Sequence, residues 1–431
     1  MGMVTDTSNK YQVSRAQAIY ILVVLTVLFF LNYADRYVLA AVLQPMKIAL
    51  GLNDTEVGLV QSAFNVGVGL LSIPMSFVIE RWSRRKTIGL LAIIWSIGTL
   101  ATGFCTKFIQ LIFTRAAVGI GEAGYATGGA SWLSVVFPKE RRGRVLGIYG
   151  IGPALGAVAG LILGGLIATK TGDWRMAFYY FAIPGVIFGI LAFFLKDYAT
   201  VKDKGETALN KKYLGDWIRL FKIKAFTFTL LGQMFFQLYY FTFLGWLPSF
   251  LMRGYNMDAG QAGAISGAAF LLTLISSPLG GWLADKWQKH NRSGRAYLMV
   301  VMQALNLILT GALLFAFGGP LSIFIIILVV QSFVVCMNPP LITTLTTDVI
   351  PIKFRATGYG LAYTFYYFVG MSLGPWLVGL ISDASGGGAT GLKNGFLLTL
   401  PALALAVIFF IINSKYYATD SERCSDQVLA E

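Results

Sequence analysis

Long apolar segments alternate with short polar gaps from one end of the chain to the other. Each apolar segment approaches the roughly 20 residues that an α-helix needs to cross a bilayer. The segments lie near residues 17–40, 57–79, 87–104, 108–136, 145–168, 176–195, 226–251, 261–284, 297–317, 320–347, 356–381 and 394–413. This pattern predicts an all-α membrane protein with twelve transmembrane helices.

The gaps divide the chain into two similar halves. Gly58 and Trp82, at the two ends of the second segment, have counterparts 205 positions later in Gly263 and Trp287. Two halves of six helices, related by an axis along the membrane normal, are a known design of secondary transporters. We therefore expect two pseudo-symmetric six-helix bundles. The expected parts are an N-terminal bundle over 1–195, a cytoplasmic linker over 196–225, a C-terminal bundle over 226–414 and a cytoplasmic tail over 415–431.

Composition and charge add a topology to this picture. The chain is 56% hydrophobic and only 13% charged, with a mean hydropathy of +0.68. Of its 34 Lys and Arg residues, 26 lie on the termini and in the gaps after even-numbered segments, and six lie in the other gaps. Because basic loops stay in the cytoplasm, both termini are expected there. The short termini are typical of a bacterial inner-membrane protein. The net charge of +14 is scattered among the gaps, which excludes a nucleic-acid interface.

No motif indicates catalysis or metal binding. Cys105, Cys336 and Cys424 have neither disulfide nor metal-ligand spacing. The chain contains no HExxH, P-loop or Gly-x-Ser-x-Gly motif. We therefore expect no cofactor, no metal and no enzymatic activity.

Charged side chains within two apolar segments are the main candidates for function. Asp35 and Arg36 lie in the first segment, and Arg115 and Glu122 lie in the fourth. Ionisable groups inside a membrane usually face a cavity and serve binding or proton relay. Arg115 and Glu122 are about two helical turns apart, or ~10 Å, on one face. The alternatives are an ion pair or anchor at a helix end and a buried, hydrogen-bonded carboxyl group.

The second half offers aromatic and amide side chains in place of charges. Aromatic residues supply stacking area and hydrogen bonds for an amphiphilic ligand. Packing and membrane-interface roles remain the alternatives for each of them. With Asn32, Tyr125 and the two arginines of the first half, the predicted substrate-binding residues are Asn32, Arg36, Arg115, Tyr125, Gln237, Tyr240, Asn338, Tyr363 and Tyr367.

The gap after the second segment resembles a signature of the major facilitator superfamily. Its sequence Ser76-Phe-Val-Ile-Glu80-Arg81-Trp82-Ser83-Arg84-Arg85 matches Gly-x-x-x-Asp-Arg-x-x-Arg-Arg, with Ser for Gly and Glu for Asp. The corresponding Gly281-Trp-Leu-Ala-Asp285-Lys286 keeps the Gly and Asp. A carboxylate at a helix end can hold basic residues of neighbouring helices and so stabilise one conformation. The predicted conformational latch consists of Glu80, Arg81, Arg84, Arg142, Asp285, Lys286 and Arg355.

Two further motifs resemble the Spinster branch of that superfamily. They are Asn32-Tyr33-Ala34-Asp35-Arg36 and the run Gly121-Glu122-Ala123-x-Tyr125 after Arg115. The resemblance implies a monomeric, proton-coupled transporter of lysophospholipids or sphingoid phosphates, with Asp35 and Glu122 in proton coupling. Sugar-acid and organic-anion symporters also begin with Asn-Tyr-x-Asp-Arg, so a small organic anion is the alternative substrate. A membrane receptor or enzyme is the alternative of a different class.

Overall fold

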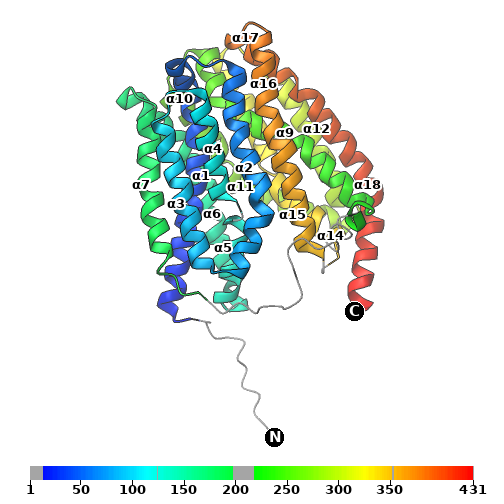
Figure 1. Ribbon diagram of the computed structural model, residues 1–431. Coiled ribbons are helices and arrows are strands. Elements are labelled where there is room, and N and C mark those ends of the chain that lie inside the picture. The colour runs from blue at the N-terminus through cyan, green and yellow to red at the C-terminus, as the bar shows by residue number, and fades with distance from the viewer. Residues whose placement is uncertain (1–12, 124, 198–217, 352–353, 431) are drawn as a thin grey trace.

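The computed structural model describes residues 13–123, 125–197, 218–351 and 354–430, and within these ranges all regular structure is helical (Figure 1). The helices of the first half are α1 (Arg15–Leu50), α2 (Asp54–Arg81), α3 (Arg84–Gly103), α4 (Phe108–Glu122), α5 (Tyr125–Val136), α6 (Lys139–Thr171) and α7 (Arg175–Ala192). Those of the second half are α9 (Lys224–Tyr255), α10 (Ala259–Leu271), α11 (Thr273–His290), α12 (Gly294–Ala316), α13 (Leu321–Val335), α14 (Asn338–Val349), α15 (Arg355–Phe365), the π-helix η3 (Tyr366–Met371), α16 (Ser372–Ala384), α17 (Gly388–Leu397) and α18 (Thr399–Ala430).

Each predicted apolar segment falls on one helix or on two or three consecutive helices. Within the described ranges, nine helical stretches are long and apolar enough to span a membrane. The segments 57–79, 108–136 and 226–251 are outside that set, so their crossing stays a prediction. The segment 108–136 is divided between α4 and α5, and the predicted tail 415–431 continues α18 as far as Ala430.

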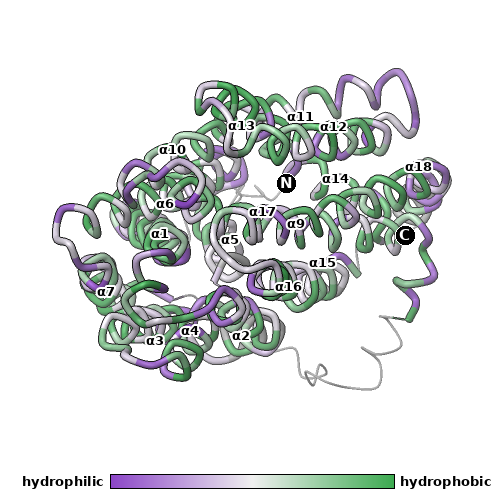
Figure 2. The backbone as a smooth tube through the Cα atoms, turned by 90° about the horizontal axis from the view of Figure 1, so that it is seen from above, coloured by the Kyte–Doolittle hydropathy of each residue, from purple (hydrophilic) through white to green (hydrophobic). Residues whose placement is uncertain are grey.

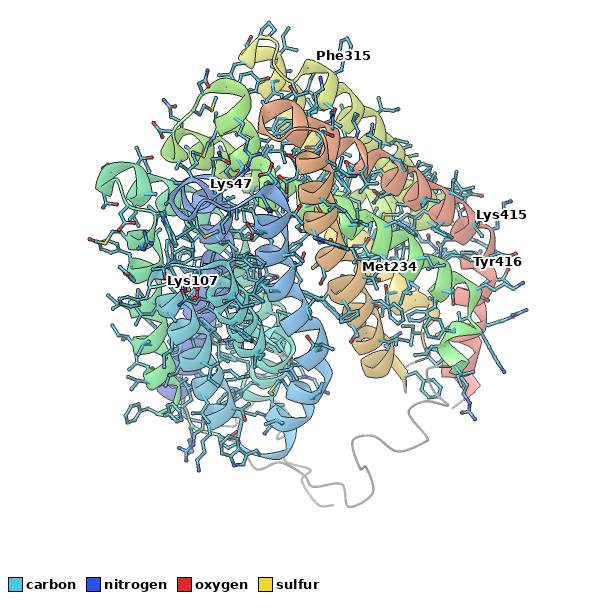
Figure 3. All side chains as sticks on the ribbon, turned by 45° about the horizontal axis from the view of Figure 1, so that its top comes forward. Lys47, Lys107, Met234, Phe315, Lys415 and Tyr416 are labelled. Atoms are coloured by element: carbon cyan, nitrogen blue, oxygen red, sulfur yellow. The ribbon has the colours of Figure 1, made fainter. Side chains whose placement is uncertain are left out.

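The outward surface of the helices is apolar. Phe315 is 91% exposed, and Phe113 and Phe104 are 70% and 68% exposed. Figure 3 shows Phe315 projecting from the outline of the molecule while side chains fill the spaces between helices. Exposed apolar area of this kind marks a surface that contacts lipid or protein. The fold is that of a multi-pass membrane protein.

Short polar motifs set where the helices begin. Asn53 caps α2: its side-chain oxygen accepts a hydrogen bond from the Glu56 backbone N–H, and its own backbone N–H donates to the Glu56 carboxylate. Asp258 caps α10 in the same way with Gln261. Such reciprocal caps satisfy backbone N–H groups that the first helical turn leaves unpaired. The two halves of the chain therefore start their second helix by the same local chemistry.

Helices of each half pack mainly on one another, and the halves meet along two seams (Figure 2). One seam joins α2 to α16, and the other joins α6 to α10. The backbones approach closely at both. A Cβ atom at Gly58 would lie 2.3 Å from the carbonyl oxygen of Pro375, and one at Gly165 would lie 2.1 Å from that of Ala259. Glycine is needed at these positions because any side chain would separate the helices.

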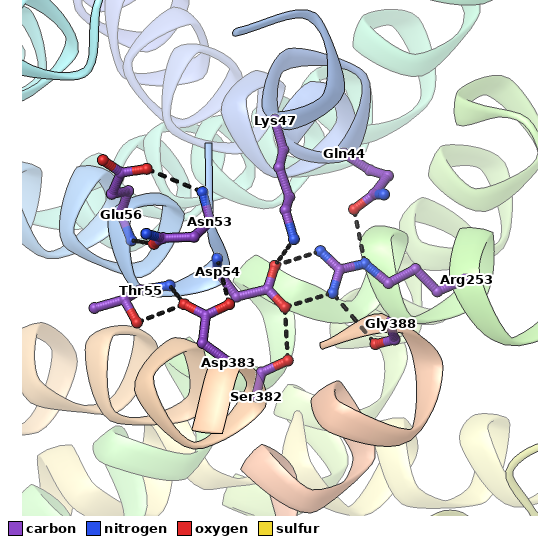
Figure 4. A network of polar contacts seen from close by, with 10 residues as sticks. All are labelled: Gln44, Lys47, Asn53, Asp54, Thr55, Glu56, Arg253, Ser382, Asp383 and Gly388. Atoms are coloured by element: carbon purple, nitrogen blue, oxygen red, sulfur yellow. Dashed lines mark hydrogen bonds and ion pairs between the residues drawn. The ribbon is translucent and has the colours of Figure 1, made fainter. Parts of the chain in front are cut away.

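A charged network joins the halves at one end of the α2–α16 seam (Figure 4). Both guanidinium Nη atoms of Arg253 on α9 donate to the Asp54 carboxylate, at 2.7 and 2.8 Å. Lys47 on α1 also donates to Asp54, and Ser382 on α16 donates to it at 2.6 Å. The network lies at the end of the molecule opposite the start of α1 and the end of α18 (Figure 1). We call Asp54, Lys47, Arg253 and Ser382 the Asp54 network.

Asp383 of α16 strengthens the same junction. Its carboxylate accepts hydrogen bonds from the backbone N–H groups of Asp54 and Thr55, at 3.0 and 2.7 Å. An anion at the start of a helix is stabilised by the helix dipole and by the unpaired N–H groups. Burial would raise the pKa of Asp54, but the hydrogen bonds and charge of Arg253 outweigh it and lower the pKa to about 2.

We predict that Asp54→Asn lowers the melting temperature much more than Asp258→Asn. The first substitution would leave Lys47 and Arg253 without their anion, at a cost of about 2–5 kcal/mol. Asp258 is the matched control, because across the other seam it accepts only a 3.3 Å hydrogen bond from Thr169. Thermal unfolding of the two purified variants in detergent measures the difference.

The contribution of the Asp54 carboxylate to the stability of the fold should not depend on pH in the physiological range. A pKa lowered to about 2 means that the stabilisation is complete above about pH 4 and is lost only as the pH falls toward 2. A gap between native and Asp54→Asn melting temperatures that closed between pH 8 and 5 would contradict this assignment.

Candidate functional site

A buried ion pair between α1 and α4 forms the centre of the site. Arg36 Nη2 lies 2.8 Å from Glu122 Oε2, and the two side chains are 7% and 0% exposed. Glu122 is the last residue of α4, which ends before α5 begins at Tyr125. Buried charges are tolerated when they are paired and hydrogen-bonded, and leaving one of them alone is costly. Arg36 and Glu122 therefore each stabilise the buried charge of the other.

Three aromatic rings lie close to the Arg36 guanidinium. Its Cζ lies 4.7 Å from the ring centre of Tyr33, 4.9 Å from that of Phe64 and 5.9 Å from that of Tyr367. Arg36 Nη1 also donates a 3.2 Å hydrogen bond to the Tyr367 hydroxyl. Ring faces attract a desolvated cation. The positive charge is thus stabilised by residues of α1, α2, α4 and η3 together.

Asp35 and Arg115 are held by two threonines on α3. Thr99 donates a hydrogen bond to the Asp35 carboxylate, and Arg115 Nη2 donates to Thr102 Oγ1 at 2.6 Å. Arg115 is fully buried and also lies 5.3 Å from the ring centre of Phe178 on α7. Thr99 and Thr102 are three residues apart, so they share one face of α3. This face of α3 positions Asp35 and Arg115 next to the Arg36–Glu122 pair.

Several polar atoms of this group have no hydrogen-bond partner among the described residues. They include Asp35 Oδ1, Glu122 Oε1, Arg36 Nε, Arg115 Nε and Asn32 Nδ2. A free carboxylate oxygen can accept a proton or a hydrogen bond, and a free guanidinium N–H can donate to an anion. The four charged residues, which we call the charged cluster, thus keep unused capacity for both.

A small cavity adjoins the charged cluster. Its volume is about 30 Å³, enough for one or two water molecules. Arg36 and Arg115 contribute to its wall, together with residues of α1, α2 and, from the second half, α9. The lining residues are Arg36, Tyr37, Leu39, Ala40, Gln61, Phe64, Asn65, Arg115, Phe241 and Gly245.

The sequence predicted the members of the charged cluster but not its pairing. Arg115 and Glu122 were expected on one helix face, about two turns apart. The structure pairs Glu122 with Arg36 and directs Arg115 to Thr102. The physical reason is distance, because two helical turns separate Arg115 from Glu122 by ~10 Å along one helix. An anchoring role for Arg115 at the outer interface does not fit its complete burial.

The predicted substrate-binding residues are dispersed. Asn32 is buried on α1, and Tyr367 reaches the charged cluster, with Tyr363 stacked on its ring at 6.3 Å. Tyr125 instead packs within the first half, where its hydroxyl donates to the Leu25 carbonyl at 3.1 Å. Asn338 is buried within the second half and accepts a 3.4 Å hydrogen bond from Gln233.

Two further candidates, Tyr240 and Gln237, lie on α9. Tyr240 stacks on Phe236 of the same helix at 5.5 Å. Gln237 packs beside Gly370, where an added Cβ would lie 3.0 Å from the Gln237 Cβ atom. Neither of them makes a hydrogen bond or ion pair with Arg36 or Arg115 within the described ranges.

Several described residues of the predicted conformational latch contact residues of their own half. Arg84 lies 3.8 Å from Asp197, and Asp285 lies 2.6 Å from Arg295. Arg142 and Arg355 donate to the backbone carbonyls of Phe137 and Ile350, at 3.2 and 3.4 Å, and Lys286 lies 5.0 Å from the Trp282 ring centre. The side chains of Glu80 and Arg81 lie outside the described residues. The latch therefore stays a prediction.

Sequence reasoning missed the residues that support the charges. Thr99 and Thr102 were visible as two hydroxyls at helical spacing in an apolar segment. Gln61 and Asn65, four residues apart on α2, were likewise visible as polar residues in an apolar segment. Arg253 gave no local signal, because its partner Asp54 lies 199 positions away in the sequence.

Comparison with known proteins gives a consistent family. Residues 25–310 match the family model of the Major Facilitator Superfamily. An MFS-type efflux pump of Mycolicibacterium smegmatis is 27% identical, with 96% of each chain covered. A sphingosine-1-phosphate transporter, SPNS2, of Xenopus tropicalis is 25% identical over 92% of this chain and 82% of its own length.

Two further similarities concern substrate class and fold. A hexuronate transporter of Bacillus subtilis is 26% identical over 91% of this chain and 94% of its own length. The crystal structure of a bacterial homologue of the lysosomal transporter Spinster, in an inward-facing and unoccupied conformation, superposes with a TM-score of 0.83. That match has 22% identity and covers 95% of this chain and 99% of the other, which supports the same fold.

We predict that Glu122→Leu is strongly destabilising and that the double variant Arg36→Met/Glu122→Leu recovers most of the loss. The single variant leaves a buried guanidinium without its anion, which costs about 3–5 kcal/mol, whereas an apolar pair of similar volume is often tolerated. Thermal unfolding in detergent measures both.

The exposed ion pair between Arg292 and Glu422 provides the control for this cycle. Its side chains are 82% and 53% exposed, and such pairs contribute little. Glu422→Leu should therefore leave the melting temperature nearly unchanged. A double variant at Arg36 and Glu122 that lost as much stability as the two single variants combined would contradict the pairing.

Proposed function

The chain belongs to the Major Facilitator Superfamily, and on this basis we propose that it is a proton-coupled transporter of an anionic amphiphile. The proposed substrate class is that of lysophospholipids and sphingoid phosphates. Transport would proceed by alternating access, in which two six-helix bundles rock around a central site. The chain would act as a monomer in the bacterial inner membrane, with both termini in the cytoplasm.

The observation that carries this proposal is the charged cluster beside the cavity. The side chains of Arg36 and Glu122 are 7% and 0% exposed, and the residues Asp35 and Arg115 are 2% and 0% exposed. Ionisable groups buried in a membrane protein are costly and are associated with substrate and proton pathways. We therefore assign the cluster to binding and coupling.

Charge balance explains how one cluster would couple two ligands. With both acids ionised, the two arginines are neutralised and an added anion would be unfavourable. When Glu122 takes up a proton, Arg36 loses its carboxylate partner and the cluster gains one positive charge. An anionic head group then restores neutrality, and the guanidinium fork suits phosphate or carboxylate. Proton binding and anion binding would therefore favour each other, as linkage requires.

The similarity to lipid transporters supports the amphiphile, and aromatic side chains support it too. Phe241 and Gly245 bring α9 to the wall of the cavity, and Tyr363 and Tyr367 stack on each other on α15 and η3, which contact α9. Apolar and aromatic surface of this kind would take the body of a substrate whose head group binds the arginines. The candidate substrate-binding residues of the second half are proposed for this part.

A small organic anion such as a sugar acid is the second candidate. The similarity to the hexuronate transporter, over 94% of its length, supports it. The charge argument applies equally, because a carboxylate would neutralise the arginines as a phosphate would. A panel that compares oleoyl-lysophosphatidylglycerol with glucuronate in proteoliposomes distinguishes the two. Uptake of glucuronate alone would overturn the amphiphile proposal and keep the coupling.

We predict that Glu122→Gln abolishes the stimulation of oleoyl-lysophosphatidylglycerol uptake by an inward proton gradient, with at least a tenfold loss. Glutamine has nearly the same shape but cannot exchange a proton. Asp35→Asn should act in the same direction. Glu140→Gln is the control, because Glu140 lies exposed in the first turn of α6. Undiminished gradient-driven uptake by Glu122→Gln would remove Glu122 from the proton pathway.

We predict that Arg115→Ala weakens binding of oleoyl-lysophosphatidylglycerol at least tenfold, because a charge-assisted hydrogen bond to the head group is lost. Arg175→Ala is the control, since Arg175 is 28% exposed by side chain and lies at the start of α7. Calorimetric titration of the detergent-solubilised variants measures the affinities. Equal affinity in Arg115→Ala and native protein would show that Arg115 does not hold the head group.

A further inference from the structure

The helix that carries Tyr367 contains a π-helical turn at the level of the charged cluster. The rod from Arg355 to Ala384 is α-helical at both ends, with the π-helix Tyr366–Met371 between them. A π-turn adds a residue to the helical repeat and occurs frequently at functional sites. Here it changes the direction in which the side chains before and after it project. Tyr367 lies at its second position.

Two side chains, one from the same helix and one from α2, donate hydrogen bonds to backbone carbonyl groups of the π-turn. The Ser372 hydroxyl donates to the Tyr367 carbonyl at 2.7 Å. Asn65 on α2, in the other half, donates to the Met371 carbonyl at 3.0 Å. Gly69 on α2 leaves room for the turn, because a Cβ there would lie 3.3 Å from the Tyr367 Cβ atom. The π-turn is thus built into the contact between the halves.

The turn places a side chain of the second half within the first half. Tyr367 and Met371 are 9% and 6% exposed and pack in the same buried cluster as Phe64 and Val68 of α2. The Tyr367 hydroxyl accepts the 3.2 Å hydrogen bond from Arg36 Nη1, while Arg36 Nη2 holds Glu122 at 2.8 Å. The two bonds use different nitrogens of one rigid guanidinium. Tyr367 therefore fixes the plane in which Arg36 meets Glu122.

We propose that Tyr367 is a positioning residue that makes the Arg36–Glu122 ion pair sensitive to the position of the second half. This proposal rests on the proposed function and specifies how the protonation of Glu122 reaches the other bundle. With Tyr367 in place, the guanidinium is oriented toward the Glu122 carboxylate. When the second half moves away, Arg36 loses this support and Glu122 takes a proton more readily.

The titratable and charged groups around Arg36 support this assignment. Tyr33 faces it from α1, Glu122 from α4 and Tyr367 from η3. Tyr363 on α15 stacks on Tyr367 and makes no described hydrogen bond to Arg36. Asp35 and Arg115 are engaged by threonines of α3, and Tyr240 of α9 packs near Tyr37. Among these groups, Tyr367 is the hydrogen-bond partner of Arg36 that belongs to the second half.

The test compares Tyr367→Phe with Tyr363→Phe by a distance measurement that needs no substrate. Phenylalanine keeps the packing ring and removes the hydroxyl. Spin labels on cysteines at Glu140 and Lys289, both exposed and on opposite halves, report the separation of α6 and α11 in liposomes. The buried Cys105, Cys336 and Cys424 are first replaced by serine. The distance distribution is then recorded between pH 5 and pH 8.5.

We expect the native distance distribution to change with pH and the midpoint of this change to move upward by about one pH unit or more in Tyr367→Phe. The direction follows because a less well oriented Arg36 stabilises ionised Glu122 less, so the carboxyl group is protonated at higher pH. Tyr363→Phe should keep the native midpoint. An unchanged midpoint in Tyr367→Phe, or an equal shift in Tyr363→Phe, would overturn the proposal and leave proton coupling intact. A native protein with no pH response would overturn the proton coupling itself.

Discussion

The buried contact between Arg36 and Glu122 is the constraint on which the rest of the site depends. A guanidinium and a carboxylate at 2.8 Å, almost without solvent exposure, are stable only while both remain charged. Three aromatic rings lie close to the Arg36 guanidinium. Two threonine hydroxyls of α3 form hydrogen bonds with the neighbouring Asp35 and Arg115. A proton on Glu122 would remove the negative charge that stabilises Arg36, so protonation of this one carboxyl group would disrupt the contact.

The same molecule contains a second charged contact with the opposite character. The Asp54 network joins the halves at one end of a seam, and the pKa of Asp54 is lowered to about 2 by Arg253 against the effect of burial. Its charges therefore stay constant across the pH range in which a cell membrane operates. The Asp54 network thus keeps its charges at the junction of the halves, whereas the Arg36–Glu122 pair is the contact that we propose a proton breaks.

The fold followed largely from the sequence, whereas the site followed only in part. The length of the apolar segments and the polar gaps between them predicted the helices, because hydrophobic burial acts on whole segments. Asp35, Arg36, Arg115 and Glu122 were found for the same reason, since charges are conspicuous in apolar segments. Their pairing could not be predicted, because it depends on the packing of α1 against α4 and on the end of α4 at Glu122. The Asp54–Arg253 contact and the π-turn that contains Tyr367 also depend on packing between segments far apart in the sequence, which no local pattern indicates.

Proton uptake on ligand binding tests most directly the central claim that the charged cluster is neutral at rest and gains a positive charge with a proton. Oleoyl-lysophosphatidylglycerol is added to detergent-solubilised protein in weak buffer near pH 7, and a pH indicator records the exchange. We expect the native protein to take up protons as the anion binds, and Glu122→Gln to bind without this uptake. Binding by the native protein with no proton uptake, or with proton release, would contradict the claim.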